Sequence, residues 1–446
     1  MTVDLVLTNA RARLEKETVS CSLAIDEGKI FRIGKEATMP DAVTRMDLKN
    51  LLVLPGLIDT HVHLRDEGKA YKEDFHSGTA AAATGGFTTL LDMPNNEPVT
   101  MSKETLRNRM EEAQSKILVN VGLYSEFPKT MREIAEIVEQ GAVAFKLFMA
   151  EQVGGLDIDD NDALFEAFRI AAELKATVAV HAEDRIALRH KIDELQKANR
   201  NDVEAYVEAH SESVEVEAMK RLIDIAEKTK VHVHFCHTTT KKGLEAIVHG
   251  KQSGIPLTCE TTPHNLLLSA DDLKRIGTLA ITMPPVRGKQ HIEALWKGIE
   301  EGWIDTIGSD HAPHSLREKM LQSVWDVKVG IPGLETTLPL LLTEVNHGRL
   351  SIADIARLMS EKPAEIFSLK GRGRLKEGNV ADLTIVDLKR KFKVDASKFQ
   401  SKAKYSPFDG WQVEGKPVKT LVNGQLIMDE GEIIAEAGTG QIVRRE

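Results

Sequence analysis

The stretch LLVLPGLIDTHVHL, residues 51–64, is an almost unbroken apolar run that ends in two histidines one residue apart. A short apolar run of this kind is consistent with a strand that is buried on both faces, as in a parallel sheet. On a strand, residues i and i+2 point to the same side, so the side chains of His61 and His63 share one face. The run therefore predicts a buried strand that carries two imidazoles at its carboxyl end.

Seven further apolar runs follow, and most are separated by helix-like stretches such as KEDFHSGTAAAATGG (72–86), whose paired glycines are typical of a helix stop. The seven runs are FTTLLDMPNN (87–96), ILVNVGLYSEF (117–127), AVAFKLFMA (142–150), ATVAVHAED (176–184), KVHVHFCHTTT (230–240), PLTCETTPH (256–264) and WIDTIGSDHAPH (303–314). Alternation of this kind indicates an α/β protein, and eight β/α units are the count of a (β/α)8 TIM barrel. We expect a barrel over residues 54–377.

At the two ends of the chain the pattern changes from alternating strands and helices to short strands joined by turns. DLVLTNARA (4–12) and SLAIDEGKIFRIG (22–34) open the chain, and ADLTIVDL (381–388) and VKTLVNGQLIMDEGEII (418–434) close it. The Asn-Gly pair in the last segment is a strong hairpin signal. We expect both termini to form one small β-sandwich domain, from residues 1–53 and 378–446.

Composition limits the classes of partner and compartment. The net charge is −10, from 58 basic and 68 acidic residues that are mixed along the sequence, which predicts no nucleic-acid partner and no anionic membrane surface. Cys21, Cys236 and Cys259 are far apart and fit reduced thiols better than a disulfide framework. The N-terminus lacks the pattern of a signal peptide, and no uncharged apolar run is long enough to span a membrane. We expect a cytoplasmic protein.

Six of the eight runs end in a metal-binding or charged residue, and in a barrel these ends share the face that carries active sites. The residues are His61 and His63, Asp92, Lys146, His181, His237 and Asp310. A lone His-X-His is as often a structural pair as a ligand, but four strand-end histidines favour a metal centre. Imidazole with oxygen ligands and no thiolate favours zinc, with cobalt or manganese as alternatives. We interpret Cys236 as a small core residue, because its strand parity is opposite to that of His237.

Lys146 is the one charge in an otherwise apolar strand, where an unpaired ammonium is costly. One reading is an ion pair with a neighbouring acid. The other is that burial and nearby cations lower its pKa, so that the neutral amine captures carbon dioxide as a carbamate. A carbamate is a carboxylate that can bridge two metal ions, and four neutral histidines leave such a pair short of anions.

Two cations that share a hydroxide hydrolyse amides by lowering the pKa of the water and polarising the carbonyl. Asp310 would accept the hydroxide proton and return it to the leaving nitrogen; its alternative role is that of a helix N-cap. Nucleophile chemistry has less support, because the sequence has no Gly-X-Ser-X-Gly elbow and no activated cysteine motif.

Eight segments in this order resemble dihydroorotases of the amidohydrolase superfamily: GLIDTHVHLRDEG, KEDFHSGTAAAATGGFTTLLDMPNN, FKLF, HAED, ETTPHNLLLS, SDHAPH, GIPGLET and SPFDGWQVEGKPVKTLVNG. The resemblance implies a distorted (β/α)8 barrel with a β domain built from both termini. It also implies the reversible cyclisation of N-carbamoyl-L-aspartate to L-dihydroorotate in pyrimidine synthesis. It also implies two zinc ions, a carbon dioxide-derived carbamate on Lys146 and a small anionic substrate.

The resemblance assigns a role to each matching position. It makes His61, His63 and Asp310 ligands of one metal and His181 and His237 ligands of the other, with Lys146 as the bridge. For the α-carboxylate of the substrate it implies the side chains of Arg65, Asn95 and His314, and for the ring amide the backbone around Pro332 and Gly333. A guanidinium fork at Arg65 suits a carboxylate.

Two positions depart from the pattern: Asn265 replaces a second histidine found in many relatives, and Met283 stands where others have Asn or Arg. The lysine type of bridge is shared with hydantoinases, dihydropyrimidinases and allantoinases, which remain the alternative enzymes. A catalytically silent partner of aspartate transcarbamoylase is the non-enzymatic alternative. For the assembly we expect a homodimer or an association with aspartate transcarbamoylase.

Overall fold

The computed structural model describes residues 2–15 and 17–445, and the core of its larger part is a ring of eight short strands. These are β6 (Leu57–Val62), β7 (Phe87–Asp92), β8 (Asn120–Leu123), β10 (Phe145–Phe148), β11 (Val178–His181), β12 (Val233–Phe235), β13 (Leu257–Thr261) and β14 (Thr306–Ile307). The paired neighbours are parallel, and β9 (Ser125–Glu126) pairs with β10 beyond the end of β8. The predicted (β/α)8 barrel is confirmed.

The ring closes through one bridge between Val62 and His311, where the His63 N–H donates to the His311 carbonyl at 2.8 Å. This closure is thin because β14 has two residues only. The ring is therefore weakly closed between the last and the first barrel strand, next to both His63 and Asp310.

Helices surround the ring and connect its strands. They are α1 (Phe75–Gly85), α2 (Lys103–Gln114), α3 (Glu133–Gln140), α4 (Asn161–Glu173), α5 (Arg185–Lys197), α6 (Val203–Ala209), α7 (Glu212–Thr229), α8 (Lys241–Gln252), α9 (Pro263–Leu267), α10 (Ala270–Ile276), α11 (Lys289–Glu300), α12 (Leu316–Lys319), α13 (Leu334–Asn346), α14 (Ile352–Ala356) and α15 (Lys362–Ile366). Helix α1 shows the local logic: Asp74 and Ser77 form a capping box at its start, and Gly86 ends it with φ 88°.

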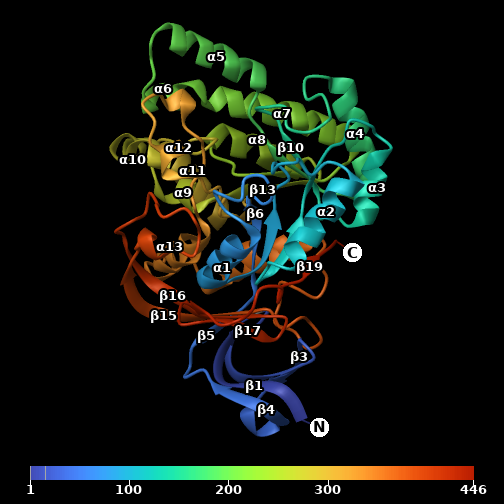
Figure 1. Cartoon of the computed structure of the whole chain (residues 1–446), viewed down its shortest axis with the longest axis vertical. Helices are drawn as coiled ribbons and strands as arrows, with labels where there is room; N and C mark the ends of the chain where they lie inside the picture. The colour runs from blue at the N-terminus through green and yellow to red at the C-terminus, as the bar shows by residue number, and fades with distance from the viewer. Residues whose placement is uncertain (1, 16, 446) are drawn as a thin grey trace.

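A nine-stranded sheet built from both ends of the chain lies beside the barrel (Figure 1). Its strands are β1 (Thr2–Arg13), β2 (Thr18–Asp26), β3 (Lys29–Gly34), β4 (Asp41–Asp47), β5 (Leu52–Pro55), β15 (Leu383–Lys393), β16 (Gln412–Val422), β17 (Gln425–Asp429) and β18 (Glu432–Ile433). The two ends meet where β5 pairs with β15, with Val53 opposite Ile385. Asn423 and Gly424 both have positive φ in the turn between β16 and β17, which confirms the predicted hairpin.

The end of the chain leaves this sheet. Strand β19 (Ile442–Val443) pairs in parallel with β8 of the barrel, with Ile442 opposite Val121.

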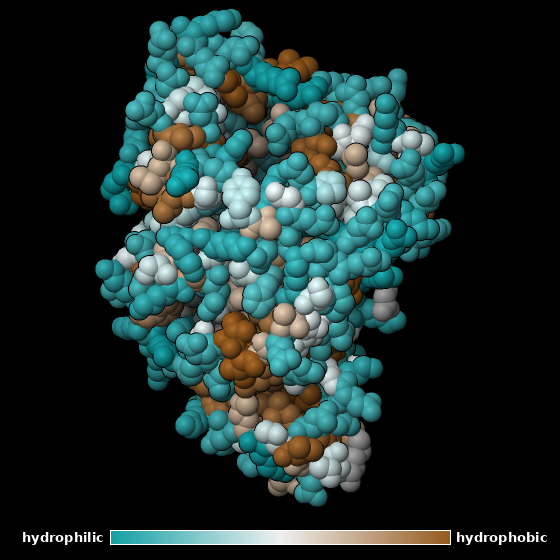
Figure 2. Space-filling view, viewed as in Figure 1, coloured by the Kyte–Doolittle hydropathy of each residue, from teal (hydrophilic) through white to brown (hydrophobic). Residues whose placement is uncertain are grey.

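The face seen in Figure 2 is mostly hydrophilic, with apolar side chains in separate patches. Among the described helices, none combines the length and the apolar character that a membrane crossing requires.

Candidate active site and metal centre

The six predicted metal ligands are brought together at the carboxyl end of the barrel, although they come from five separate strands. His61 lies on β6 and Lys146 on β10, His181 ends β11, His237 follows β12, and Asp310 follows β14. All six are buried, and all except Lys146 line a cavity of about 480 Å³. Residues far apart in sequence thus lie together at the same end of the barrel, as the barrel geometry predicts.

One group of ligands consists of His61, His63 and Asp310, whose ligand atoms all lie within 4.8 Å of one another. The Oδ1 atom of Asp310 is 3.4 Å from Nε2 of His61 and 3.5 Å from Nε2 of His63. Two imidazole nitrogens and one carboxylate oxygen at these distances can hold a single divalent cation. His181 and His237 form the other group, with Nδ1 of His181 3.1 Å from Nε2 of His237.

Acid–base chemistry favours the metal-binding forms of two of these ligands. Burial and the nearby Arg65 outweigh Asp310 and lower the pKa of His63 to about 3, so its imidazole is neutral. Burial raises the pKa of Asp310, but His61 and His63 outweigh burial and lower it to about 2. The site thus combines a neutral imidazole with an ionised carboxylate.

The ring nitrogen that faces away from the centre is held by an acceptor in three of the four histidines. Nδ1 of His61 lies 2.8 Å from Glu260, Nδ1 of His63 lies 2.7 Å from Oδ1 of Asn95, and Nε2 of His181 lies 2.8 Å from Glu183. Such contacts fix the tautomer and the orientation of metal-ligating histidines. These contacts therefore orient three of the four imidazoles toward the centre, as a metal site requires.

Glu260 and Glu183 were not identified from the sequence. Glu260 also accepts from the hydroxyl of Thr60 at 2.5 Å and from the backbone N–H of His237 at 3.2 Å. Glu183 joins His181 to His210, which lies 2.8 Å away. The available signal was their position, since Glu260 lies at the end of an apolar run and Glu183 lies two residues after His181.

Lys146 is fully buried beneath the cavity, and its ammonium donates to Sγ of Cys236 at 3.1 Å. Within residues 2–15 and 17–445, no carboxylate lies within ion-pair distance of this ammonium. The ion-pair reading of Lys146 therefore lacks its partner in this structure. The core interpretation of Cys236 is confirmed, since the residue packs in a buried apolar cluster, and its thiol in addition accepts from Lys146 and lies close to His61 and Glu260.

Three residues of the site have backbone conformations that L-residues rarely adopt. Arg65, His237 and Asp310 have φ angles of 64°, 31° and 47°. Positive φ outside glycine is strained and is often found at functional sites.

Asp92 ends a barrel strand but has a structural role: its carboxylate accepts from the Leu64 N–H at 2.8 Å and pairs with Arg109.

The predicted substrate residues divide into two groups. Arg65, Asn95 and His314 line the cavity, and Nη2 of Arg65 lies 3.2 Å from Nε2 of His314. Pro332 and Gly333 do not line the cavity. The N–H of Gly333 donates to Nδ1 of His311 at 3.1 Å, and its carbonyl accepts from the hydroxyls of Thr336 and Thr337. A substrate contact from Pro332 or Gly333 stays a prediction.

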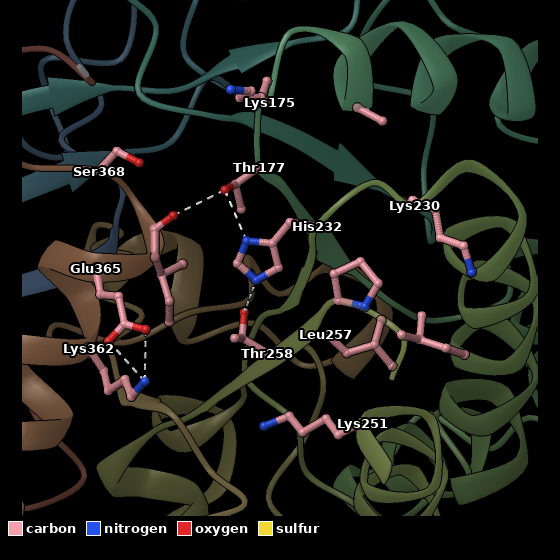
Figure 3. A pocket seen from close by; sticks show the side chains of 15 residues that line it. Lys175, Thr177, Lys230, His232, Lys251, Leu257, Thr258, Lys362, Glu365 and Ser368 are labelled. Atoms are coloured by element: carbon pink, nitrogen blue, oxygen red, sulfur yellow. Dashed lines mark hydrogen bonds and ion pairs between the residues drawn. The ribbon is translucent and has the colours of Figure 1, made fainter. Parts of the chain in front are cut away.

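A cavity of about 650 Å³ opens at the opposite end of the barrel (Figure 3). Its one histidine, His232, contacts the hydroxyls of Thr177 and Thr258 through its two nitrogens. Lys362, on its rim, pairs with Glu365. This cavity has none of the ligand clusters described above, so the candidate site is the cavity that contains the histidines.

Comparison with known proteins agrees with this geometry. The model of the amidohydrolase family matches residues 52–427. A dihydroorotase from Methanothermobacter thermautotrophicus is 37% identical over 99% of this chain and 98% of its own length. An L-hydantoinase from Paenarthrobacter aurescens is 34% identical over 99% of this chain and 98% of its own.

A solved structure of an L-hydantoinase from Arthrobacter aurescens covers 99% of this chain and all of its own, with a TM-score of 0.96 and 34% identity. A D-hydantoinase from Thermus sp. has a TM-score of 0.92 and 26% identity, and the match covers 99% of both chains. The matched residues include every predicted metal ligand, and the chain belongs to the amidohydrolase family.

Proposed function

We propose that this protein is a dihydroorotase, which interconverts N-carbamoyl-L-aspartate and L-dihydroorotate in pyrimidine synthesis. The observation that carries the proposal is the state of Arg65. Its side chain is 7% exposed and lines the cavity next to His63. Among the described residues it has no carboxylate partner, its Nε has no acceptor, and its one contact is with His314.

A buried guanidinium without a counter-ion is costly, so the anion that completes it must come from the ligand. Dihydroorotate has a carboxylate on its ring, and a carboxylate fits a guanidinium fork in two-point fashion. Names of relatives support the same activity, since several chains at 34–37% identity are dihydroorotases.

An L-hydantoinase type of cyclic amide hydrolase is the second candidate, because a protein of that name has the TM-score of 0.96. Hydantoins, dihydropyrimidines and allantoin are ring amides without the carboxylate, so they would leave Arg65 unpaired. A catalytically silent assembly partner has less support, since all six candidate ligand positions are retained.

Two zinc ions are the cofactors that we propose, with cobalt or manganese as substitutes. His61, His63 and Asp310 would hold one, His181 and His237 the other, and Lys146, as a carbamate made with carbon dioxide, would lie between them. Such a pair of ions lowers the pKa of water and polarises the amide carbonyl.

The residues of the chain then have distinct tasks. Asp310 would take the proton of the attacking water on a carboxylate oxygen and pass it to the ring nitrogen as the amide opens; in the cyclisation the proton travels the other way. Arg65 and Asn95 would hold the substrate carboxylate. With Oδ1 of Asn95 engaged by His63, its Nδ2 remains as the donor toward the substrate. Met283 contributes an apolar wall.

The test is a paired assay on purified protein supplied with zinc and bicarbonate. Hydrolysis of L-dihydroorotate is compared with hydrolysis of allantoin, dihydrouracil and a hydantoin, and metal content is measured on the same sample. Turnover of dihydroorotate with two metals per chain is the expected result. Turnover of a neutral ring amide alone would favour the second candidate, and a fully metallated protein without any turnover would favour the silent partner.

A further inference from the structure

Lys69 is a second cation of the active-site cavity without a counter-ion. It follows Arg65 in the loop between β6 and α1, is partly buried, and lines the same cavity. Within residues 2–15 and 17–445, no carboxylate lies within ion-pair distance of its ammonium. The ammonium makes one hydrogen bond, to the backbone carbonyl of Asn95 at 3.2 Å. An ammonium has more donors than this one contact uses, so Lys69 can still donate to a ligand.

The contact with Asn95 joins the two loops that carry the proposed carboxylate-binding side chains. Arg65 and Lys69 lie on the loop after β6, and Asn95 lies on the loop after β7. The N–H of Gly68 also donates to the carbonyl of Glu97 at 2.9 Å, so the two loops are held together through their backbones. Donors from both loops, on Arg65, Lys69 and Asn95, therefore line one cavity.

Two other basic side chains of this cavity are already engaged. The ammonium of Lys72 is 2.8 Å from Oε1 of Glu318 and 3.0 Å from Nδ1 of His314. Burial, together with Arg65 and Lys72, holds the pKa of His314 far below its ordinary value, so the ring is neutral. Its one hydrogen is on Nε2, which lies 2.9 Å from the carbonyl of Val329. His314 thus has no free hydrogen for a ligand.

Arg65 and Lys69 interact unfavourably in the free protein. Burial and the charge of Arg65 lower the pKa of Lys69, because both disfavour its ammonium form. A carboxylate bound between the two side chains would relieve this repulsion and accept from both of them. A neutral ring amide would leave the repulsion in place.

We propose that Lys69 is a specificity-determining residue that donates, together with Arg65, to the carboxylate of the substrate and so favours an anionic ring amide over a neutral one. The inference rests on the proposed function for the identity of that substrate. Lys69 acts on the carboxylate and makes no contact with the predicted metal ligands, so its loss affects the binding of the anion rather than the chemistry at the amide.

The first experiment uses orotate and uracil, two planar ligands that differ only in the carboxylate. Calorimetry measures their dissociation constants with zinc-supplemented wild type, Lys69→Met and Lys328→Met, which removes a cation from the exposed rim of the same cavity. Loss of one charge-assisted hydrogen bond should weaken orotate binding about tenfold in Lys69→Met and leave uracil binding unchanged. Lys69→Arg, which keeps the charge, should restore most of the affinity.

Three results of this titration overturn the role of Lys69. They are an equal weakening of orotate in Lys328→Met, an equal weakening of uracil in Lys69→Met, and a wild-type protein that binds orotate no more tightly than uracil. The last result also contradicts the carboxylate-binding role of Arg65.

Steady-state kinetics separate this inference from the proposed function. The KM for dihydroorotate should rise about tenfold in Lys69→Met, with kcat unchanged. Wild-type protein that prefers orotate to uracil but does not turn over dihydroorotate contradicts the proposed function alone. Turnover of dihydroorotate with the same KM in wild type and in Lys69→Met contradicts only the role of Lys69.

Discussion

Replacing Arg65 by methionine tests the substrate assignment most directly. The guanidinium is buried, faces the cavity, and among the described residues has one hydrogen-bond contact, with His314. Truncating one partner of a buried, hydrogen-bonded charge pair costs about 2–5 kcal/mol, which corresponds to a weakening of about 30-fold to several thousandfold. Because Asn95 and Lys69 remain, we expect the lower part of this range, about 100-fold in KM.

The same substitution has an opposite effect on the free protein. In wild type the unpaired guanidinium is desolvated without a counter-ion, and methionine removes that penalty while keeping much of the volume. We expect Arg65→Met to have a Tm equal to or above that of wild type and an unchanged metal content. Steady-state kinetics on dihydroorotate, thermal unfolding and metal analysis are measured together, with Lys328→Met as the control for charge. An unchanged KM, or a loss of metal, would refute the assignment.

Four further predictions concern the metal centre. Lys146→Ala should lower the metal content below two ions per chain and abolish activity, because no carbamate can form; two ions retained by elemental analysis would contradict the bridge. Asp310→Ala should lower kcat at least about 100-fold, and a wild-type rate would remove its role as the proton carrier. Glu260→Gln should weaken metal affinity about 10–100-fold in a chelator titration, because His61 loses its orienting acceptor; unchanged affinity would contradict that role. Burial and Lys146 lower the pKa of His61, but Asp310, Cys236 and Glu260 outweigh them and raise it to about 10. Metal uptake at neutral pH should therefore release this proton, and metal affinity should weaken as pH falls. Calorimetry in buffers of different ionisation enthalpy measures the proton release.

Strand parity explains which of the predicted side chains face the centre and which face the core. His61 and His63 both face the centre, as a two-residue repeat requires. Cys236 packs in the core, as its parity opposite to that of His237 predicts, and it does not line the cavity. Because β12 ends at Phe235 and His237 has φ 31°, the alternation stops there, and the Cys236 thiol still reaches the Lys146 ammonium. A pattern along the chain does not reveal where a strand ends to within one residue.

The acceptors behind the histidines were missed for another reason. Glu260 is 199 residues from His61, and nothing in the sequence links the two until the barrel closes. A glutamate near the end of a buried strand can also have a purely structural role, so the residue type alone does not identify the group that it contacts. Asp92 illustrates this, because it ends a barrel strand like the ligands but accepts directly from the Leu64 N–H and pairs with Arg109.

The sequence by itself determined the barrel, the terminal β domain and the set of candidate ligands, because apolar periodicity and the residue at each strand end are local properties of the chain. Only the tertiary structure decided which groups are satisfied and which are not. The unpaired state of Arg65 and the contact of Lys72 with His314, 242 residues away, depend on distances of about 3 Å between side chains from different β/α units. Hydrogen-bond partnership is set at that scale, and the sequence fixes it only through the complete fold.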